Sequence, residues 1–302
     1  MFPKWKQPYD DMVKRMAEHN NMKKAVQQIM LGTVTGKHEQ TLKVLNRIKA
    51  SGYDGLELNR YMIHPTPMFV RMLTRVAGMP TGNGGRLNWN ELIKASGFSV
   101  FSLHTDLGSL EKEMDAIIEE AKSFHTDKIV ITGMYGFDYS DEKEIDNLIM
   151  RLNKAGKTLK ESGLSLLYHN HNAELTCVDS GMRMYDILLR ETEPEYVNFE
   201  FDSYWFADAG ADPCRWMQTL GTRMKLWHVT DRGIRYSKKA MTPILKADSM
   251  ELGTGNLELE KMKEIAETNG VEAVVLESHK NWINKDPMQS IELSGKWMNQ
   301  NI

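Results

Sequence analysis

Cysteine is scarce in this chain, and long apolar runs are missing. The two cysteines, Cys177 and Cys214, lie far apart without a CxxC spacing, which argues against a disulfide framework or a thiolate metal site and favours a reducing compartment. No run approaches the roughly 18 apolar residues of a membrane span, and the charged amino terminus has no signal-peptide core or cleavage site. We therefore expect a cytoplasmic protein that does not enter membranes.

An excess of charge of one sign is also missing. The 38 Lys and Arg residues nearly balance the 41 Asp and Glu residues, which gives a formal net charge of −3. Because no basic field is available to hold a phosphate backbone, nucleic acid is not an expected partner. The 302 residues are 41% hydrophobic, without a break in composition, an internal repeat or a low-complexity tract. This composition favours one large α/β domain.

The first 27 residues have the pattern of an amphipathic helix. Tyr9, Met12 and Met16 recur at three- and four-residue spacings among charged side chains, as they would on one face of a helix. Such a helix would cap the floor of the domain that follows or meet a partner. We expect a helical extension over residues 1–27 and a catalytic domain over residues 28–302.

From residue 28 onward, short apolar strands alternate with helices. Strands are predicted at 29–34, 55–58, 99–104, 128–132, 164–171, 195–202, 223–228 and 271–277. Helices are predicted at 38–50, 110–123, 141–162, 181–191, 213–220, 257–269 and 287–300. This alternation predicts a (β/α)8 TIM barrel, because a doubly wound open sheet would need a glycine-rich first turn that residues 32–36 do not provide. The irregular stretch from Asn59 to Asn90 is expected to be a loop that covers the substrate.

Histidines gather at the carboxyl ends of these strands. Five of the nine fall at or just beyond a predicted strand end: His104, His169, His171, His228 and His279. Apolar strands that enter a barrel have no structural need of imidazoles. Their positions therefore point to a functional site.

The same strand ends carry carboxylates. Residues i and i+2 of a strand share one face, so His169 and His171 point together, as do Glu200 and Asp202. A parallel barrel brings its strand ends to one mouth. There we expect a metal site made of His169 or His171 with the following residues: Asp202, His228 and Glu277. Carboxylates and imidazoles without a thiolate suit Mn²⁺, Mg²⁺, Co²⁺ or Zn²⁺, while a buried ion pair with Arg or Lys is the alternative explanation for each carboxylate.

Four segments carry a resemblance to a known family. They are Glu200 to Trp205 (EFDSYW), Leu226 to Asp231 (LWHVTD), Glu251 to Asn256 (ELGTGN) and Val275 to Ser278 (VLES). In order, spacing and barrel position they resemble the sugar phosphate isomerase/epimerase family, the xylose isomerase-like TIM barrels. The resemblance extends from about residue 28 to the carboxyl terminus.

This resemblance implies a set of metal ligands, with Mn²⁺ as the leading candidate ion. Asp202, His228 and Glu277 match the family's ligands. In ketose epimerases of the family, a glutamate on the fifth strand completes the set and exchanges protons with the substrate. Here that strand offers His169, and the next glutamate is Glu174. We expect His169 to take the ligand position, with Glu174 as the alternative.

The chemistry of such a site needs few groups. A metal that chelates a sugar carbonyl and its neighbouring hydroxyl makes the adjacent C–H acidic through an enediolate, and a base then removes the proton. His171 or Glu277 is the expected base. Other side chains would orient the sugar: Glu57, His104, Glu200, Trp205, Asp231, Arg232 and Trp282. Plain packing is the alternative explanation for the two tryptophans.

The leading prediction is therefore a metal-dependent sugar isomerase or epimerase. The second is a lyase that cleaves a keto-glycoside by β-elimination, because the fifth-strand glutamate is missing and the loop after Asn59 is long. Relatives of the second kind work with a small second subunit, which the amino-terminal helix would serve, and a homo-oligomer is a further alternative. Cleavage of abasic DNA and sugar binding without catalysis are more distant alternatives, the first disfavoured by the net charge of −3.

Overall fold

The computed structural model describes residues 22–65, 72, 86–235 and 242–302. The predicted amino-terminal helix up to residue 21, and most of the predicted covering loop between residues 66 and 85, lie outside the described residues. Within the described ranges, no helix combines the length and the apolar character that crossing a bilayer requires.

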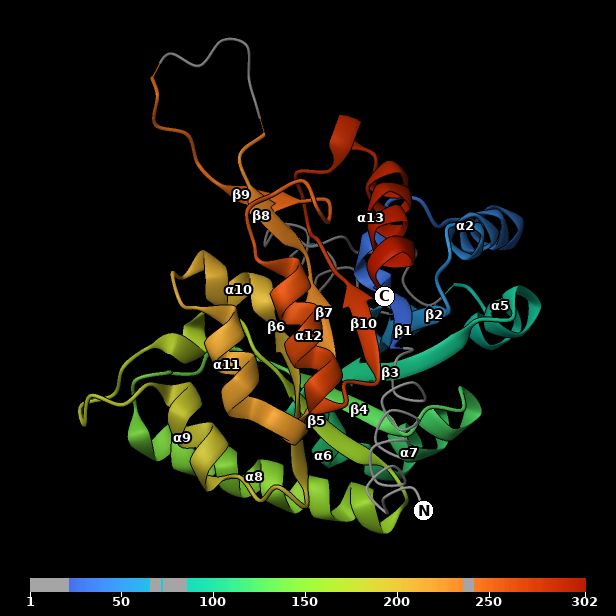
Figure 1. Ribbon diagram of the computed structural model, residues 1–302. Helices are drawn as coiled ribbons and strands as arrows, with labels where there is room; N and C mark the ends of the chain where they lie inside the picture. The colour runs from blue at the N-terminus through green and yellow to red at the C-terminus, as the bar shows by residue number, and fades with distance from the viewer. Residues whose placement is uncertain (1–21, 66–71, 73–85, 236–241) are drawn as a thin grey trace, which may run out of the picture.

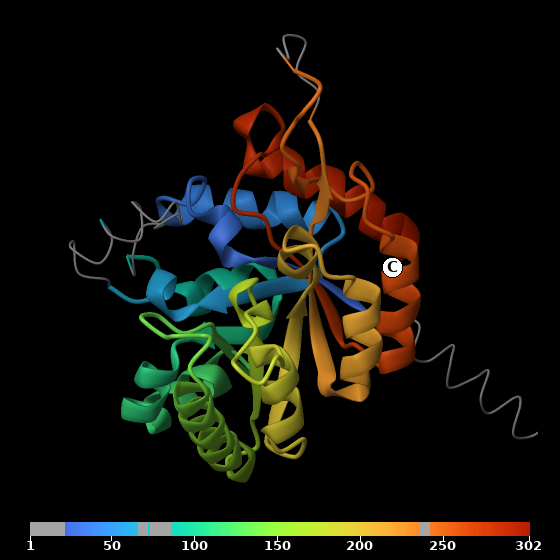
Figure 2. The same cartoon turned by 90° about the vertical axis from the view of Figure 1, so that its left-hand side faces the viewer.

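Eight parallel strands close into a barrel, which confirms the predicted fold class. They are β1 (Lys23–Gln27), β2 (Gly55–Asn59), β3 (Ser99–Thr105), β4 (Lys128–Thr132), β5 (Ser165–His169), β6 (Val197–Asp202), β7 (Met224–Val229) and β10 (Ala273–Leu276). The first strand pairs with both the second and the last, so the ring has no free edge. Figures 1 and 2 show these strands at the centre of the molecule with the helices around them.

Most helices lie close to their predicted positions, and local signals explain several of their ends. They are α2 (His38–Ala50), α3 (Arg60–Ile63), α5 (Trp89–Ser96), α6 (Leu107–Lys112), α7 (Met114–Ser123), α8 (Glu142–Glu161), α9 (Met184–Glu191), α11 (Pro213–Leu220), α12 (Leu259–Asn269) and α13 (Pro287–Asn301). Asp212 caps α11 with Pro213 at its first turn, a favoured arrangement because proline needs no amide donor there. Gly270 ends α12 in the left-handed conformation, which glycine adopts without strain.

The position predicted for the first strand was wrong. The strand is Lys23–Gln27, and the residues expected to form it begin with the 3-10 turn Gln28–Leu31. Ile29, Met30 and Leu31 are all buried, and a short buried apolar run has the same pattern whether it is a strand or a turn packed into the core. Residues 23–27 therefore belong to the barrel and not to a helical extension.

Several elements were not predicted, among them the helices α3 and α5. A short helix, α10 (Ser203–Asp208), follows β6 directly, and an antiparallel hairpin joins β8 (Asp231–Gly233) to β9 (Asp248–Met250). Both elements lie beyond the carboxyl ends of barrel strands, and Figure 1 shows the hairpin rising above that end of the barrel. They add structure to the face on which TIM barrels carry their active sites.

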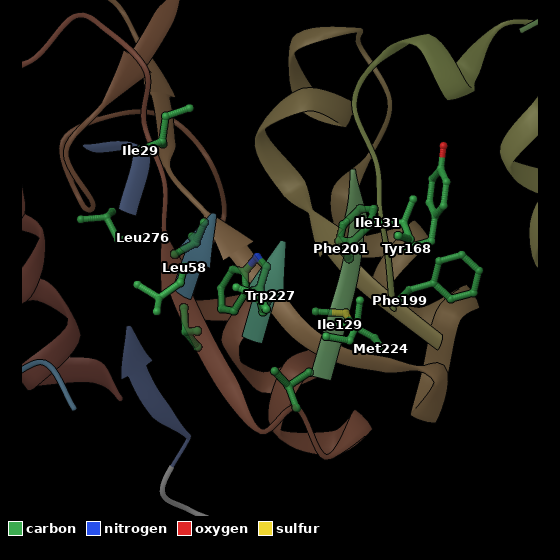
Figure 3. Close-up of a cluster of buried hydrophobic side chains, with 14 of the residues drawn as sticks. Ile29, Leu58, Ile129, Ile131, Tyr168, Phe199, Phe201, Met224, Trp227 and Leu276 are labelled. Atoms are coloured by element: carbon green, nitrogen blue, oxygen red, sulfur yellow. The ribbon is translucent and has the colours of Figure 1, made fainter. Parts of the chain in front are cut away.

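Alternation along the strands separates two environments. Outward side chains such as Tyr168, Phe201 and Trp227 pack against the helices in the main core, part of which Figure 3 shows. Inward side chains form a small separate plug low in the barrel: Val130, Leu167, Leu226 and Ala273, with Phe101 against them. Two residues beyond Leu167 and Leu226 come His169 and His228, so the inner face changes from apolar to polar toward the mouth.

Close packing of α8 on the sheet provides a test of this fold. A Cβ at Gly156 would lie 2.3 Å from the carbonyl oxygen of Tyr196. We expect Gly156→Ala to lower the free energy of unfolding by about 1–3 kcal/mol, because the helix must move away from the strand. Lys157→Ala, at the exposed neighbouring position, should stay within about 0.5 kcal/mol of the unsubstituted chain. Equal denaturation midpoints for the two variants would contradict this packing.

Candidate metal centre at the mouth of the barrel

Four side chains from neighbouring strands converge at the mouth. His169 ends β5, Asp202 ends β6, His228 lies in β7 and Glu277 follows β10, and one ligand atom of each lies within 4.8 Å of the others. We call these four residues the upper group. They are the residues that the sequence predicted to meet, and whether they bind a metal stays a prediction.

Strand pairing explains why the upper group comes together. Asp202 is paired with His228 across β6 and β7, and His228 is paired with Val275 across β7 and β10. Asn170 links β5 to β6, because its amide donates to the carbonyl oxygen of Asp202 and accepts from the Asp202 backbone N–H, both at 3.0 Å. The strand ends are thereby held at one height.

His228 is the centre of the upper group. Its Nδ1 lies 2.9 Å from Glu277 Oε2 and 3.9 Å from Asp202 Oδ2. Burial raises the pKa of Asp202 to about 6, against the effect of the nearby His169 and His228. Burial also raises the pKa of Glu277, but the imidazoles of His228 and His279 outweigh it and hold that pKa well below its usual value.

The donor set fits a divalent cation. It offers two carboxylates and two imidazoles, a combination that Mn²⁺, Mg²⁺, Co²⁺ and Zn²⁺ accept. The alternative explanation required Arg or Lys partners. Among the described residues, Asp202 and Glu277 form ion pairs only with histidines. Buried carboxylates need compensation by a cation, a protonated imidazole or hydrogen bonds, and a divalent ion bound here would supply it.

A second layer of polar side chains lies below the upper group. Glu57, His104 and Glu200, which we call the lower layer, are at most 2% exposed. His104 Nε2 lies 2.9 Å from an oxygen of each glutamate, and Ser102 donates to Glu57. Burial lowers the pKa of His104, but the two carboxylates raise it overall to about 10. A protonated His104 therefore balances charge inside the barrel.

The lower layer consists of three residues to which the sequence analysis gave another role. Glu57, His104 and Glu200 were expected to orient the sugar. They are buried in contact with the upper group, whose own side chains are at most 9% exposed, so their direct contact with a substrate stays a prediction. The sequence correctly indicated the inward face of the strands, but not the depth at which each side chain lies.

Three aromatic side chains form the rim beside the upper group. The ring of Trp205 lies 5.7 Å from that of His171 and 6.0 Å from that of His279. Burial and the neighbouring His169 lower the pKa of His171 to about 3, so its imidazole is neutral. His279 Nε2 lies 3.3 Å from Glu277 Oε1. The sequence analysis noted His279 at a strand end without giving it a role, although its i+2 spacing from Glu277 was a signal.

Glu174 lies outside the upper group. Its Oε1 accepts from the hydroxyl of Tyr168 at 2.8 Å, and its Oε2 accepts from the backbone N–H of His171 at 2.9 Å. Of the two candidates for the fourth ligand position, only His169 is in the group. Glu174 instead holds the backbone that carries His171.

The remaining predicted sugar contacts are engaged in local structure. Asp231 is 1% exposed, and its carboxylate accepts backbone N–H bonds from Arg232, Gly253, Gly255 and Leu257. Direct contact between Asp231 and a sugar is therefore not supported. Arg232 Nε donates to Asp208 on α10 at 3.0 Å, and Trp282 Nε1 donates to Ser278 Oγ at 2.8 Å. For Arg232 and Trp282, sugar contact stays a prediction.

Residues 45–300 match the family described as the xylose isomerase-like TIM barrel. The chain belongs to the xylose isomerase-like TIM barrel family. The match includes β5, β6, β7 and β10, the strands that carry the upper group.

Known relatives of this xylose isomerase-like barrel include isomerases and dehydratases. A sugar phosphate isomerase/epimerase from Parabacteroides distasonis has a TM-score of 0.72 at 18% identity, over 92% of this chain and 94% of that one. A xylose isomerase-like TIM barrel protein from Mycobacterium smegmatis, in complex with magnesium, has a TM-score of 0.65 at 12% identity, over 93% and 97%. At these identities the similarity concerns the fold.

The inosose dehydratases of Mesomycoplasma hyopneumoniae are more similar in sequence over a shorter stretch. They are 36% identical over 93 residues, which is 31% of this chain and 30% of theirs. The match therefore spans less than a third of the length of these curated relatives.

The hydrogen bonds of Asp231 lead to a stability prediction. We expect Asp231→Ala to lower the free energy of unfolding by about 2–4 kcal/mol, because buried N–H donors lose their acceptor. Glu260→Gln, at an exposed position, should have an effect within about 0.5 kcal/mol. Chemical denaturation monitored by tryptophan fluorescence would measure both. An Asp231→Ala variant of unchanged stability would contradict the anchoring role.

Proposed function

We propose that this protein is a divalent-metal-dependent enzyme that removes a proton next to a carbonyl of a sugar, as an isomerase or epimerase does. The convergence of His169, Asp202, His228 and Glu277 at the barrel mouth carries the proposal. These four residues would hold the ion. When bound, a divalent cation acts as a Lewis acid that makes the C–H beside a chelated carbonyl more acidic.

His171 is the base in this proposal. Its ring packs edge to face against that of His169 at 5.0 Å, which places it beside the upper group, and burial keeps the imidazole neutral. Glu174 fixes its backbone. Glu277, the other base predicted from the sequence, is already in contact with His228 and His279.

His279, like His171, lies beside the ring of Trp205. Burial lowers the pKa of His279, but the carboxylate of Glu277 raises it overall above its usual value. Two imidazoles whose environments push their pKa values apart suit a base and an acid. In the proposed reaction, His171 accepts the proton from carbon, which leaves the sugar as an enediolate. His279 then donates a proton to this enediolate.

A lyase is the second candidate. An imidazole, His169, occupies the position at which the ketose epimerases resembled by this sequence carry a proton-exchanging glutamate, and the inosose dehydratase relatives are named for an elimination. The same proton removal, followed by departure of a β substituent, would release water or an aglycone. His279 would then protonate the leaving group.

Metal removal tests the proposal. The protein is dialysed against a chelator and incubated in D₂O with a panel of ketoses and 3-keto-glycosides, before and after addition of Mn²⁺, Mg²⁺, Co²⁺ or Zn²⁺. We expect no reaction after chelation and recovery with at least one ion. Deuterium in a recovered sugar indicates isomerase or epimerase chemistry, whereas a released leaving group indicates the lyase. Full activity in chelator would contradict both.

The role of His171 has a separate test. We expect His171→Asn to lower kcat by about 100-fold or more while the affinity for the ion stays within a few-fold, because His171 is outside the upper group. His125→Asn is the matched control, since His125 is exposed and already has a positive φ of 56° that asparagine tolerates. Rapid deuterium exchange into the sugar by the His171 variant would assign the base elsewhere.

A further inference from the structure

The two histidines of the upper group both face a carboxylate of the lower layer. His228 Nε2 lies 2.5 Å from Glu57 Oε2 in a hydrogen bond. The other ring nitrogen, Nδ1, lies on the side of Glu277 and Asp202. One imidazole thus connects the two layers, with Nε2 below and Nδ1 above.

His169 is turned the opposite way. Its Nδ1 lies 3.3 Å from Glu200 Oε2, and the two residues are paired across β5 and β6. Because Nδ1 faces the lower layer, Nε2 lies on the other side of the ring from Glu200. The two histidines therefore differ in the nitrogen that they turn toward the mouth.

The lower layer is built to hold these orientations. Glu57 and Glu200 are completely buried, at 0% exposure. Ser102 donates to Oε1 of Glu57. His104 Nε2 lies 2.9 Å from Glu57 Oε2 and also 2.9 Å from Glu200 Oε2. Glu57 thus lies below His228, and Glu200 lies below both imidazoles, 3.3 Å from His169 Nδ1 and 3.2 Å from His228 Nε2.

We propose that Glu57 and Glu200 are positioning residues, which make His228 present Nδ1 and His169 present Nε2 to the cation of the upper group. The inference rests on the proposed function, because it concerns the same ion. A histidine that binds a metal commonly donates its second N–H to a carboxylate, which fixes the tautomer and the ring orientation. Here two different nitrogens are selected within one site.

Substitution by amides tests which nitrogen binds. The side-chain amide of asparagine reaches about as far as Nδ1 of histidine, and that of glutamine about as far as Nε2. We expect His228→Asn to retain more affinity for Co²⁺ and Zn²⁺ than His228→Gln, and His169→Gln to retain more than His169→Asn. Competition with a chromophoric chelator measures the affinities, and the visible spectrum of Co²⁺ reports the ligands. The reverse order, or equal affinities, at either position would overturn the proposal.

Removal of the lower carboxylates is the second measurement. Glu57→Gln and Glu200→Gln should each weaken Co²⁺ and Zn²⁺ affinity by about 10- to 100-fold. Glu174→Gln is the matched control, because Glu174 is equally buried and its side chain accepts hydrogen bonds from the backbone of His171 and the hydroxyl of Tyr168. Its affinity should be unchanged. Circular dichroism and melting curves verify that each variant is folded.

Metal stoichiometry separates the remaining outcomes. One donor atom from each of Glu57, His104, Glu200 and His228 also lies within 4.8 Å of the others, a geometry that admits an ion in the lower layer. One ion per chain supports the positioning role, whereas two ions would overturn it by making these carboxylates ligands. If the unsubstituted protein binds no cation, the proposed function fails as well. If it binds one ion but the Asn and Gln variants at positions 228 and 169 do not show the expected ranking of metal affinities, only this inference fails.

Discussion

Burial of charge inside the barrel is the constraint on which this structure depends. Carboxylates and imidazoles occupy the inner face of the strands, where an unpaired charge would cost several kcal/mol. They alternate in space, so that Glu57, Glu200, Asp202 and Glu277 each face at least one imidazole. The arrangement tolerates little error, because a one-residue slip of a strand would turn its charged side chains toward the apolar helices.

The inner face of the barrel consists of three layers, one apolar and two charged. An apolar plug fills the lower part of the barrel, Glu57, His104 and Glu200 lie above it, and the upper group lies at the carboxyl ends of the strands. Support around the mouth is equally specific. Asn170 ties β5 to β6, and Asp202 contributes twice, since its Oδ1 caps α10 through the Trp205 N–H while its Oδ2 faces His228. The donor atoms of the upper group are therefore positioned by the scaffold as a whole.

An imidazole at the end of β5 changes what this mouth can do. A glutamate at the end of β5, together with Glu277, would supply two carboxylates able to exchange protons with a substrate. Here His169 lies beside a neutral His171, and the second titratable group at the rim is His279 with Glu277. The proposed function therefore assigns proton transfer to His171 and His279, both beside Trp205, an arrangement compatible with both isomerisation and elimination.

The sequence by itself determined the barrel, most of its strands and helices, and three members of the upper group, with His169 as the leading choice for the fourth. It did so because period-two alternation reports which face a side chain occupies, and chain order reports which strand end it reaches. Only the tertiary structure decided how deep each side chain lies in the barrel and which groups it contacts. Glu57, His104 and Glu200 are buried below the upper group, and Asp231 holds a turn through backbone hydrogen bonds. Depth depends on the stagger of all eight strands and on local irregularities such as the register shifts beside Glu57 and Glu200. No single segment encodes those quantities, since they arise when the ring closes.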